Sequence, residues 1–201
     1  MTTQEFGNHA KQPDGGGEYL ALSFSPLSAP LRSRWRNNGV SADFLGDYVT
    51  TFLPADGAIT GSGKSPKEIK YAVTYIANEL LENAMKYHDR DVDTPIGIRL
   101  DLTSEWISIS VSNSASSGQA ERYREFVDQM VAGDAGELML RQLEANALLA
   151  GADSCMGLLT IVSDYDARLG WRFEGQPARH GSFTVTTSAE LSIRAVLGVS
   201  E

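Results

Sequence analysis

The segment SPKEIKYAVTYIANELLENAMKYH, residues 65–88, decides the fold. Ser65 can cap a helix, Pro66 suits the first helical position, and Glu68 completes a capping box with Ser65. These signals predict a helix that begins at Pro66 and runs through about residue 87. Apolar side chains recur along it with the helical period, as a stripe that must face a core: Ile69, Val73, Ile76, Leu80, Ala84 and Tyr87.

A ridge of three polar residues, Glu79, Asn83 and Lys86, accompanies this stripe. At ~100° per residue, their i, i+4, i+7 spacing puts them at the edge of the apolar face rather than opposite it. We expect all three to line a single cleft between the helix and a sheet. The spacing alone is equally typical of an ordinary amphipathic helix with a boundary asparagine and one charge pair.

Two pairs of alternating segments predict two antiparallel hairpins, each with one buried face. The first pair is IGIRLDL (96–102) and WISISVS (106–112), and the second is LGWRF (169–173) and SFTVTT (182–187). In the first hairpin the side chains expected to face the core are Ile96, Ile98, Leu100, Leu102, Ile107, Ile109 and Val111.

The remaining elements complete an α+β pattern. YLALSFSP (19–26) alternates as a strand, SADFLGDYVTTFLP (41–54) and GLLTIVSDYDA (157–167) have helical spacing, and residues 120–150 form a helical insert. This order predicts a two-layer sandwich with helices on one face of a mixed, mostly antiparallel sheet. The polar, glycine-ending stretch 1–17 is expected to be a disordered leader before one domain, 18–201.

Composition and charge narrow the classes of function. The chain has 201 residues and a net charge of −9, so binding to nucleic acid or to an anionic membrane is disfavoured. Its single cysteine, Cys155, excludes an intrachain disulfide framework and a multi-cysteine zinc site. There is no apolar run of the ~20 residues that a membrane helix needs, and the first residues lack a signal peptide's apolar stretch. We therefore expect a cytoplasmic protein.

The segment NELLENAMKY, residues 78–87, resembles the N-box of the GHKL (histidine-kinase-like) ATPase superfamily. The family pattern, Glu-x-x-x-Asn-x-x-Lys followed by His or Tyr, is matched at Glu79, Asn83, Lys86 and Tyr87. Together with PLRSRWRNNG and GLLTIVSDYDARLGWRFE, the segment is most similar to the SiaB-type bacterial regulators and the anti-sigma serine kinases. This narrower resemblance spans about residues 19–190.

The resemblance implies a Bergerat-type ATP-binding fold that holds ATP and Mg²⁺, with a variable helical lid at about residues 114–156. It makes Asn83 the magnesium ligand, Glu79 the catalytic base, and Lys86 and Tyr87 nucleotide-binding residues. Asn113 stands where the family has the aspartate that accepts a hydrogen bond from adenine. Only Gly157 and Leu158 are left of the second glycine box, and both glycines of the first are missing.

Two functions follow from the resemblance. The first is an ATP-dependent serine/threonine kinase of a bacterial partner-switching pathway, whose substrate is a small STAS-like or SiaC-like regulatory protein; a homodimer is compatible with it. The second is a non-catalytic, pseudokinase-like module that sequesters such a partner without ATP chemistry. The missing glycines favour the second, because glycine lets backbone amides approach phosphates closely.

Overall fold

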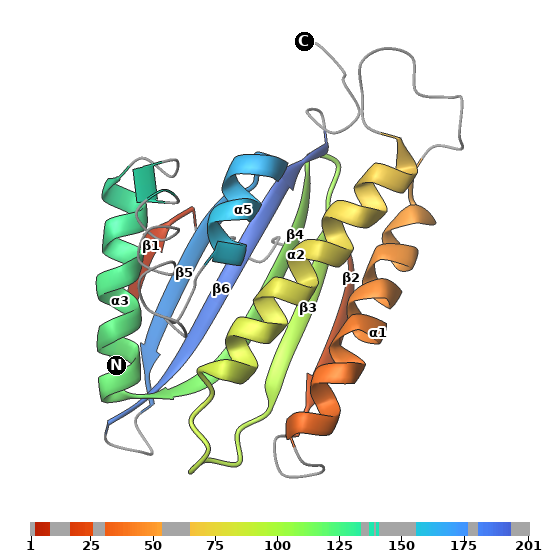
Figure 1. Ribbon diagram of the computed structural model, residues 1–201. Coiled ribbons are helices and arrows are strands. Elements are labelled where there is room, and N and C mark those ends of the chain that lie inside the picture. Colours follow the sequence, from red (N-terminus) through yellow and green to blue (C-terminus); the bar gives the residue numbers. More distant parts are fainter. Residues whose placement is uncertain are drawn as a thin grey trace.

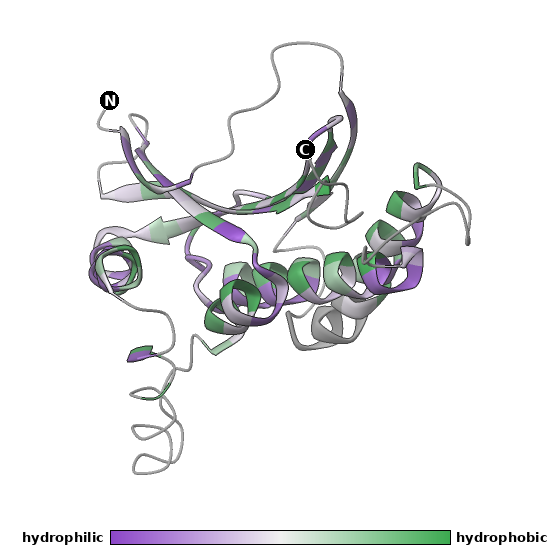
Figure 2. Ribbon diagram, turned by 90° about the horizontal axis from the view of Figure 1, so that it is seen from above, coloured by the Kyte–Doolittle hydropathy of each residue, from purple (hydrophilic) through white to green (hydrophobic). Residues whose placement is uncertain are grey.

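A computed structural model describes residues 3–8, 17–25, 31–53, 65–133, 137–138, 140, 156–176 and 181–193. Within these ranges the chain is an α+β protein with one six-stranded sheet and four helices (Figure 1). The helices lie against one face of the curved sheet, and none of the described helices lies on the other face (Figure 2). The predicted α+β class and the helix-on-one-face arrangement are confirmed.

The sheet has the strand order β1-β5-β6-β4-β3-β2, and every described pairing is antiparallel. The sequence had suggested a mixed sheet, and this part of the prediction is wrong for the described strands. Its strands are β1 (Thr3–Gly7), β2 (Glu18–Phe24), β3 (Ile96–Leu102), β4 (Trp106–Ser116), β5 (Arg168–Gly175) and β6 (Ser182–Ser192). Both predicted hairpins are present, as β3–β4 and β5–β6.

The helices are α1 (Leu31–Thr50), α2 (Pro66–Lys86), α3 (Ser117–Ala132) and α5 (Met156–Tyr165). The central helix α2 begins as predicted, with Ser65 accepting from the Glu68 backbone and the Glu68 side chain returning to the Ser65 backbone. Its apolar stripe packs on the buried face of β3 and β4, where Leu100 lies opposite Ile109 and Ile98 opposite Val111. Each such fully buried side chain contributes about 1.5–3 kcal/mol.

The prediction that residues 1–17 form a disordered leader is partly wrong, because Thr3–Gly7 is a strand paired with β5. Phe6 supports it by packing edge-on against Phe173, with ring centroids 5.6 Å apart. A five-residue strand with one large apolar side chain has almost no local signal, and its pairing partner lies more than 160 residues later in the chain.

Two predicted boundaries also move. The polar residues Ser114–Ser116 belong to β4, so the lid expected at 114–156 begins too early; Ser116 then caps α3 with Gln119. Helix α1 begins at Leu31, ten residues before the expected start at Ser41. The lid residues 134–136, 139 and 141–155 lie outside the described part of the chain.

Close packing of α1 on α2 depends on Gly46. A Cβ there would collide with the Thr74 hydroxyl and lie 3.1 Å from the Lys70 carbonyl oxygen. We expect Gly46→Ala to lower the free energy of unfolding by about 1–3 kcal/mol, because the two helices must separate. The control is Gly39→Ala in the same helix, where a Cβ meets nothing within 4 Å. It should stabilise the protein by about 0.5–1 kcal/mol through helix propensity. Urea unfolding of both variants measures the difference.

Candidate functional site

A small cavity of about 20 Å³ lies between α2, α3 and the sheet, large enough for one water molecule. Asn83 and Tyr87 of α2 reach it from one side, Asn113 from β4, and Tyr123 from α3. Three residues that the sequence had predicted for the site, Asn83, Tyr87 and Asn113, therefore meet here, although Asn113 is thirty positions from Asn83. The full lining is Leu80, Asn83, Ala84, Tyr87, Val111, Asn113, Ala115, Gln119, Tyr123, Val185 and Thr187.

Asn113 is a buried polar residue with a fixed orientation. Its amide nitrogen donates to the carbonyl oxygens of Ser114, at 3.0 Å, and Tyr87, at 3.4 Å. Both N–H groups of the amide donate to backbone carbonyl oxygens. The amide oxygen is therefore the group through which this side chain can bind a ligand, as an acceptor. That is the chemistry needed to accept a hydrogen bond from an adenine amino group.

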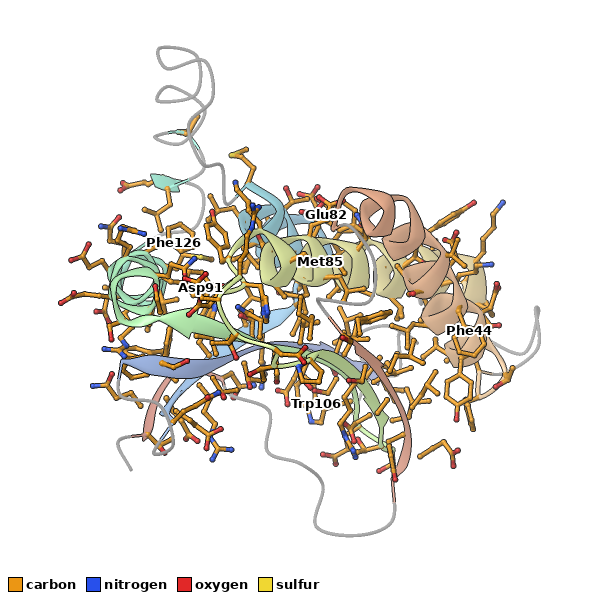
Figure 3. All side chains as sticks on the ribbon, turned by 90° about the horizontal axis from the view of Figure 1, so that it is seen from below. Phe44, Glu82, Met85, Asp91, Trp106 and Phe126 are labelled. Carbon is orange, nitrogen blue, oxygen red and sulfur yellow. The ribbon has the colours of Figure 1, made fainter. Side chains whose placement is uncertain are left out.

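Tyr123 lines the cavity from α3, and no pattern in the sequence marked it as a functional residue. Its ring stacks on Tyr87 with centroids 6.0 Å apart. Its hydroxyl accepts from Trp171 Nε1 at 3.0 Å and shares a hydrogen bond with Thr187 at 3.2 Å. The only sequence signal was its place in the apolar stripe of α3, which also contains Phe126, labelled on α3 in Figure 3. That stripe predicts packing and carries no information about a cavity.

The expected single cleft does not contain Glu79, which faces α5 instead. A Cβ added to Gly157 would lie 2.5 Å from Glu79 Cδ and would overlap its carboxylate oxygen. Gly157 therefore lets the first turn of α5 touch this carboxylate, and a larger residue there would require the Glu79 side chain to shift. The stacking of Tyr75 on Tyr165, with centroids 5.2 Å apart, holds α5 and α2 together on the same side.

The other two predicted residues also lie outside the cavity lining. Lys86 is exposed, and its Nζ lies over the Tyr87 ring, 5.3 Å from the centroid. Leu158 is completely buried in the core. The ridge of Glu79, Asn83 and Lys86 is thus divided, with only Asn83 in the cavity.

Glu79 is electrostatically unusual for a carboxylate on a helix. Its pKa is raised above the ordinary value, first by burial and then by the charge of Glu82, while a hydrogen bond from Tyr75 lowers it in part. A carboxylate whose pKa is raised holds a proton more readily, as a proton acceptor in catalysis must.

This shift predicts a pH-dependent effect of Glu79→Gln on stability. Between the ordinary pKa of 4.5 and the raised one, the folded protein binds more protons than the unfolded chain, so Glu79 lowers stability as pH rises. Glutamine keeps an acceptor for Tyr75 and carries no charge. The variant should therefore resist urea better than wild type at about pH 8 and match it at about pH 4. An equal difference at both pH values would contradict the assignment.

His88, directly after α2, is a second buried titratable group near the site. It is 2% exposed, and neither ring nitrogen has a hydrogen-bond partner of normal geometry among the described residues. Burial lowers its pKa, while the Val92 backbone and the Asp89 charge oppose this in part. The backbone N–H of Asp89 donates to the Ser114 carbonyl oxygen at 2.8 Å. This hydrogen bond fixes the end of α2 against β4, beside Asn113.

Among the residues that the structure describes, no three His, Cys, Asp or Glu side chains could hold a metal ion together. None of the described helices is both long and apolar enough to cross a membrane. Comparisons with models of known protein families and with curated proteins gave no match.

Proposed function

We propose that this chain is a GHKL-type regulatory protein that binds ATP with Mg²⁺ and phosphorylates a hydroxyl of a small partner protein. The observation that carries the proposal is the meeting of Asn83 and Asn113 at one cavity. They stand at the N-box asparagine and at the adenine-contacting position of the family pattern. Their convergence from α2 and β4 is what a shared nucleotide site requires.

The donor chemistry fits a magnesium nucleotide. Mg²⁺ prefers oxygen ligands and is commonly held by one or two protein groups together with phosphate oxygens, so a cage of carboxylates is not needed. The Asn83 amide oxygen can supply one such ligand. Asn113 can accept from an amino group, and Tyr87 and Tyr123 offer aromatic faces next to it.

The space, however, is small. Ligand pockets are usually about 300–1,000 Å³, whereas this cavity is about 20 Å³. A nucleotide would have to separate Tyr123 from Tyr87 and move the first turn of α5 away from Glu79. Both contacts join α2 to a neighbouring helix, so opening needs no change within the sheet.

The remaining residues have defined tasks in the proposed reaction. Bound magnesium–ATP supplies the transferable phosphoryl group and the charge that activates it. Glu79, with its raised pKa, would accept the proton of the attacking hydroxyl. Lys86, exposed over the ring of Tyr87, would add positive charge next to the cavity, where it can oppose phosphate charge. Such a reaction suits a cytoplasmic bacterial signalling pathway.

A second candidate is a non-catalytic module that binds the partner without ATP. The small volume of the cavity and the contact of Glu79 with Gly157 favour it, because a carboxylate lies where α5 would otherwise offer its first amides to a phosphate. Calorimetric titration with ATP, in the presence of magnesium and again with EDTA, separates the two. The kinase requires magnesium-dependent heat, and the non-catalytic module predicts none.

A further inference from the structure

One face of the sheet carries none of the described helices, and this face is hollowed. Figure 2 shows that the sheet curves away from the helices, so the face is concave. A hollow of about 670 Å³ lies on it and is lined from all six strands, a volume in the range of ligand pockets. We call this hollow the open-face trough. The residues across its middle lie directly opposite one another, one on each strand: Glu5, Arg172, Thr186, Ser112, Gly97 and Ser23.

Short side chains form the floor of the trough, and charged side chains stand at its two ends. On the floor, the hydroxyls of Ser112 and Thr186 hydrogen-bond to each other at 2.8 Å. Arg99 of β3 stands at one end, and charged residues of β5 and β1 stand at the other. β3 and β5 are three strand spacings apart, about 14 Å. The trough can therefore hold an elongated polar ligand that lies across the strands.

Gly97 lies inside β3 at a position where the fold does not require a glycine. It pairs with Ser23 of β2 and Ser112 of β4 without a bulge, and its φ is not positive. A Cβ would have the Leu22 carbonyl oxygen, 4.0 Å away, as its closest neighbour, so packing does not exclude a side chain. A glycine inside a strand weakens it and often marks a place where a ligand approaches the backbone. The bare backbone at Gly97 gives such access, on the same strand face as Arg99.

Arg99 is a fixed hydrogen-bond donor at one end of the trough. Its Nε and Nη2 donate to the Asp101 carboxylate at 2.7–2.9 Å, and its guanidinium lies 4.0 Å from the centroid of the Tyr19 ring. Asp101 is 7% exposed and is not among the residues that line the trough. The N–H groups of Nη1 do not bind Asp101, so the planar guanidinium can still donate to an oxyanion. This end of the trough therefore favours an anionic group.

The other end of the trough carries an excess of negative charge. Arg172 Nη2 donates to the Glu174 carboxylate at 2.7 Å, and Arg172 Nε lies 3.8 Å from Glu5 Oε1. One guanidinium between two carboxylates balances only one of them, which leaves one negative charge in excess. The three side chains are 39–52% exposed, so their charges are accessible to a ligand. This end of the trough therefore favours a cationic group.

We propose that the open-face trough binds a short peptide with free ends, about four residues long. The carboxylate of the peptide binds Arg99, and its ammonium group lies between Glu5 and Glu174. An extended peptide advances ~3.4 Å per residue, so four residues span the distance of about 14 Å between β3 and β5. The floor hydroxyls can donate to peptide carbonyl oxygens and accept from peptide N–H groups.

A nucleotide matches the trough less well than a peptide does. Its phosphates would meet the two glutamates, and none of the described lining residues is aromatic and able to stack on a base. The trough also lies on the opposite face of the sheet from the cavity of Asn83 and Asn113, which is on the side of α2 (Figure 2). It is therefore a second site, separate from the proposed nucleotide site.

Titration with tetra-alanine, followed by amide chemical shifts, tests both the ligand and its place. A peptide of this size is expected to bind with a Kd of about 10 μM–1 mM, and the amide signals of β3, β4 and β5 around the trough should shift. Amidation of the carboxyl end and acetylation of the amino end should each weaken binding at least about tenfold, because each removes one charge. No nucleotide is added, so the outcome does not depend on the proposed kinase reaction. The absence of shifts with tetra-alanine at about 10 mM, or equal binding of either blocked peptide, overturns the proposal.

Two substitutions test the contacts of the peptide. Gly97→Val should weaken binding at least about tenfold, because its methyl groups cover the backbone next to Arg99. The variant should resist urea at least as well as wild type, since valine favours a strand and the closest neighbour of its Cβ is 4.0 Å away. The matched control is Ser108→Val, on the same face of β4 but outside the trough, which should bind like wild type.

Glu174→Gln should weaken the binding of tetra-alanine and leave the binding of the acetylated peptide unchanged, because only a free ammonium group uses that charge. Glutamine keeps an acceptor for Arg172, so the variant should fold like wild type. Wild-type affinity for tetra-alanine in either Gly97→Val or Glu174→Gln overturns the proposal.

Discussion

Glu79→Gln is expected to slow the release of inorganic phosphate from ATP by about 10²–10⁴-fold, the usual contribution of a general base. Glutamine keeps the size of the side chain and its acceptor oxygen but cannot take a proton. Nucleotide affinity should change little, because a base is needed for proton transfer rather than for holding the nucleotide. The same substitution should stabilise the protein at high pH, since it removes a half-buried charge.

The assay uses water as the acceptor, so the natural partner is not required. Phosphate release is followed at saturating ATP and magnesium for wild type, Glu79→Gln and the control Glu82→Gln. Glu82 is three positions away on α2 and accepts from Asn78 at 2.9 Å, outside the cavity. Its variant should keep most of the activity. Equal rates for Glu79→Gln and wild type would remove Glu79 from the proposed reaction, and a wild type without any release would favour the non-catalytic candidate.

Tyr123→Ala should produce the largest loss of stability among the site variants, about 2–4 kcal/mol. The ring stacks on Tyr87 and Phe126 and meets Phe173 edge-on, so its removal opens a void between α3 and the sheet. It also leaves the buried indole N–H of Trp171 without its acceptor.

Tyr123→Phe separates these two effects. It keeps the ring and loses only the hydroxyl, so we expect about 1–2 kcal/mol. Tyr71→Ala is the exposed control and should stay within about 0.5 kcal/mol of wild type. Urea unfolding monitored by circular dichroism measures all three. A loss below 1 kcal/mol for Tyr123→Ala would show that α3 does not depend on this residue.

The sequence was most informative where structure is local. The start of α2 is encoded by three adjacent residues, and each hairpin by strict alternation over a few positions, so both could be predicted. β1 could not, because its stability comes from pairing with β5 and from the single contact of Phe6 with Phe173. The longer α1 was missed since its first ten residues lack a clear apolar period.

For the site, spacing on one helix located Asn83 but could not tell which neighbour each ridge residue meets. A helical wheel gives the direction of Glu79 and not the element that covers it. Gly157 lies on this carboxylate because of how α5 packs. A glycine at this position can be explained in two ways. Motif comparison interprets it as part of a phosphate loop, whereas the structure adds that a larger residue would require the Glu79 side chain to shift.

The central claim is that Asn83 and Asn113 form one site for magnesium–ATP, and calorimetric titration of Asn83→Ala tests it most directly. The control is Asn78→Ala, an asparagine on the same helix that does not line the cavity. The account predicts magnesium-dependent heat of binding for wild type and Asn78→Ala, and none for Asn83→Ala, which lacks the oxygen ligand. A folded wild-type protein that gives no heat with ATP and magnesium at millimolar nucleotide would contradict it, as would an Asn83→Ala variant that binds like wild type.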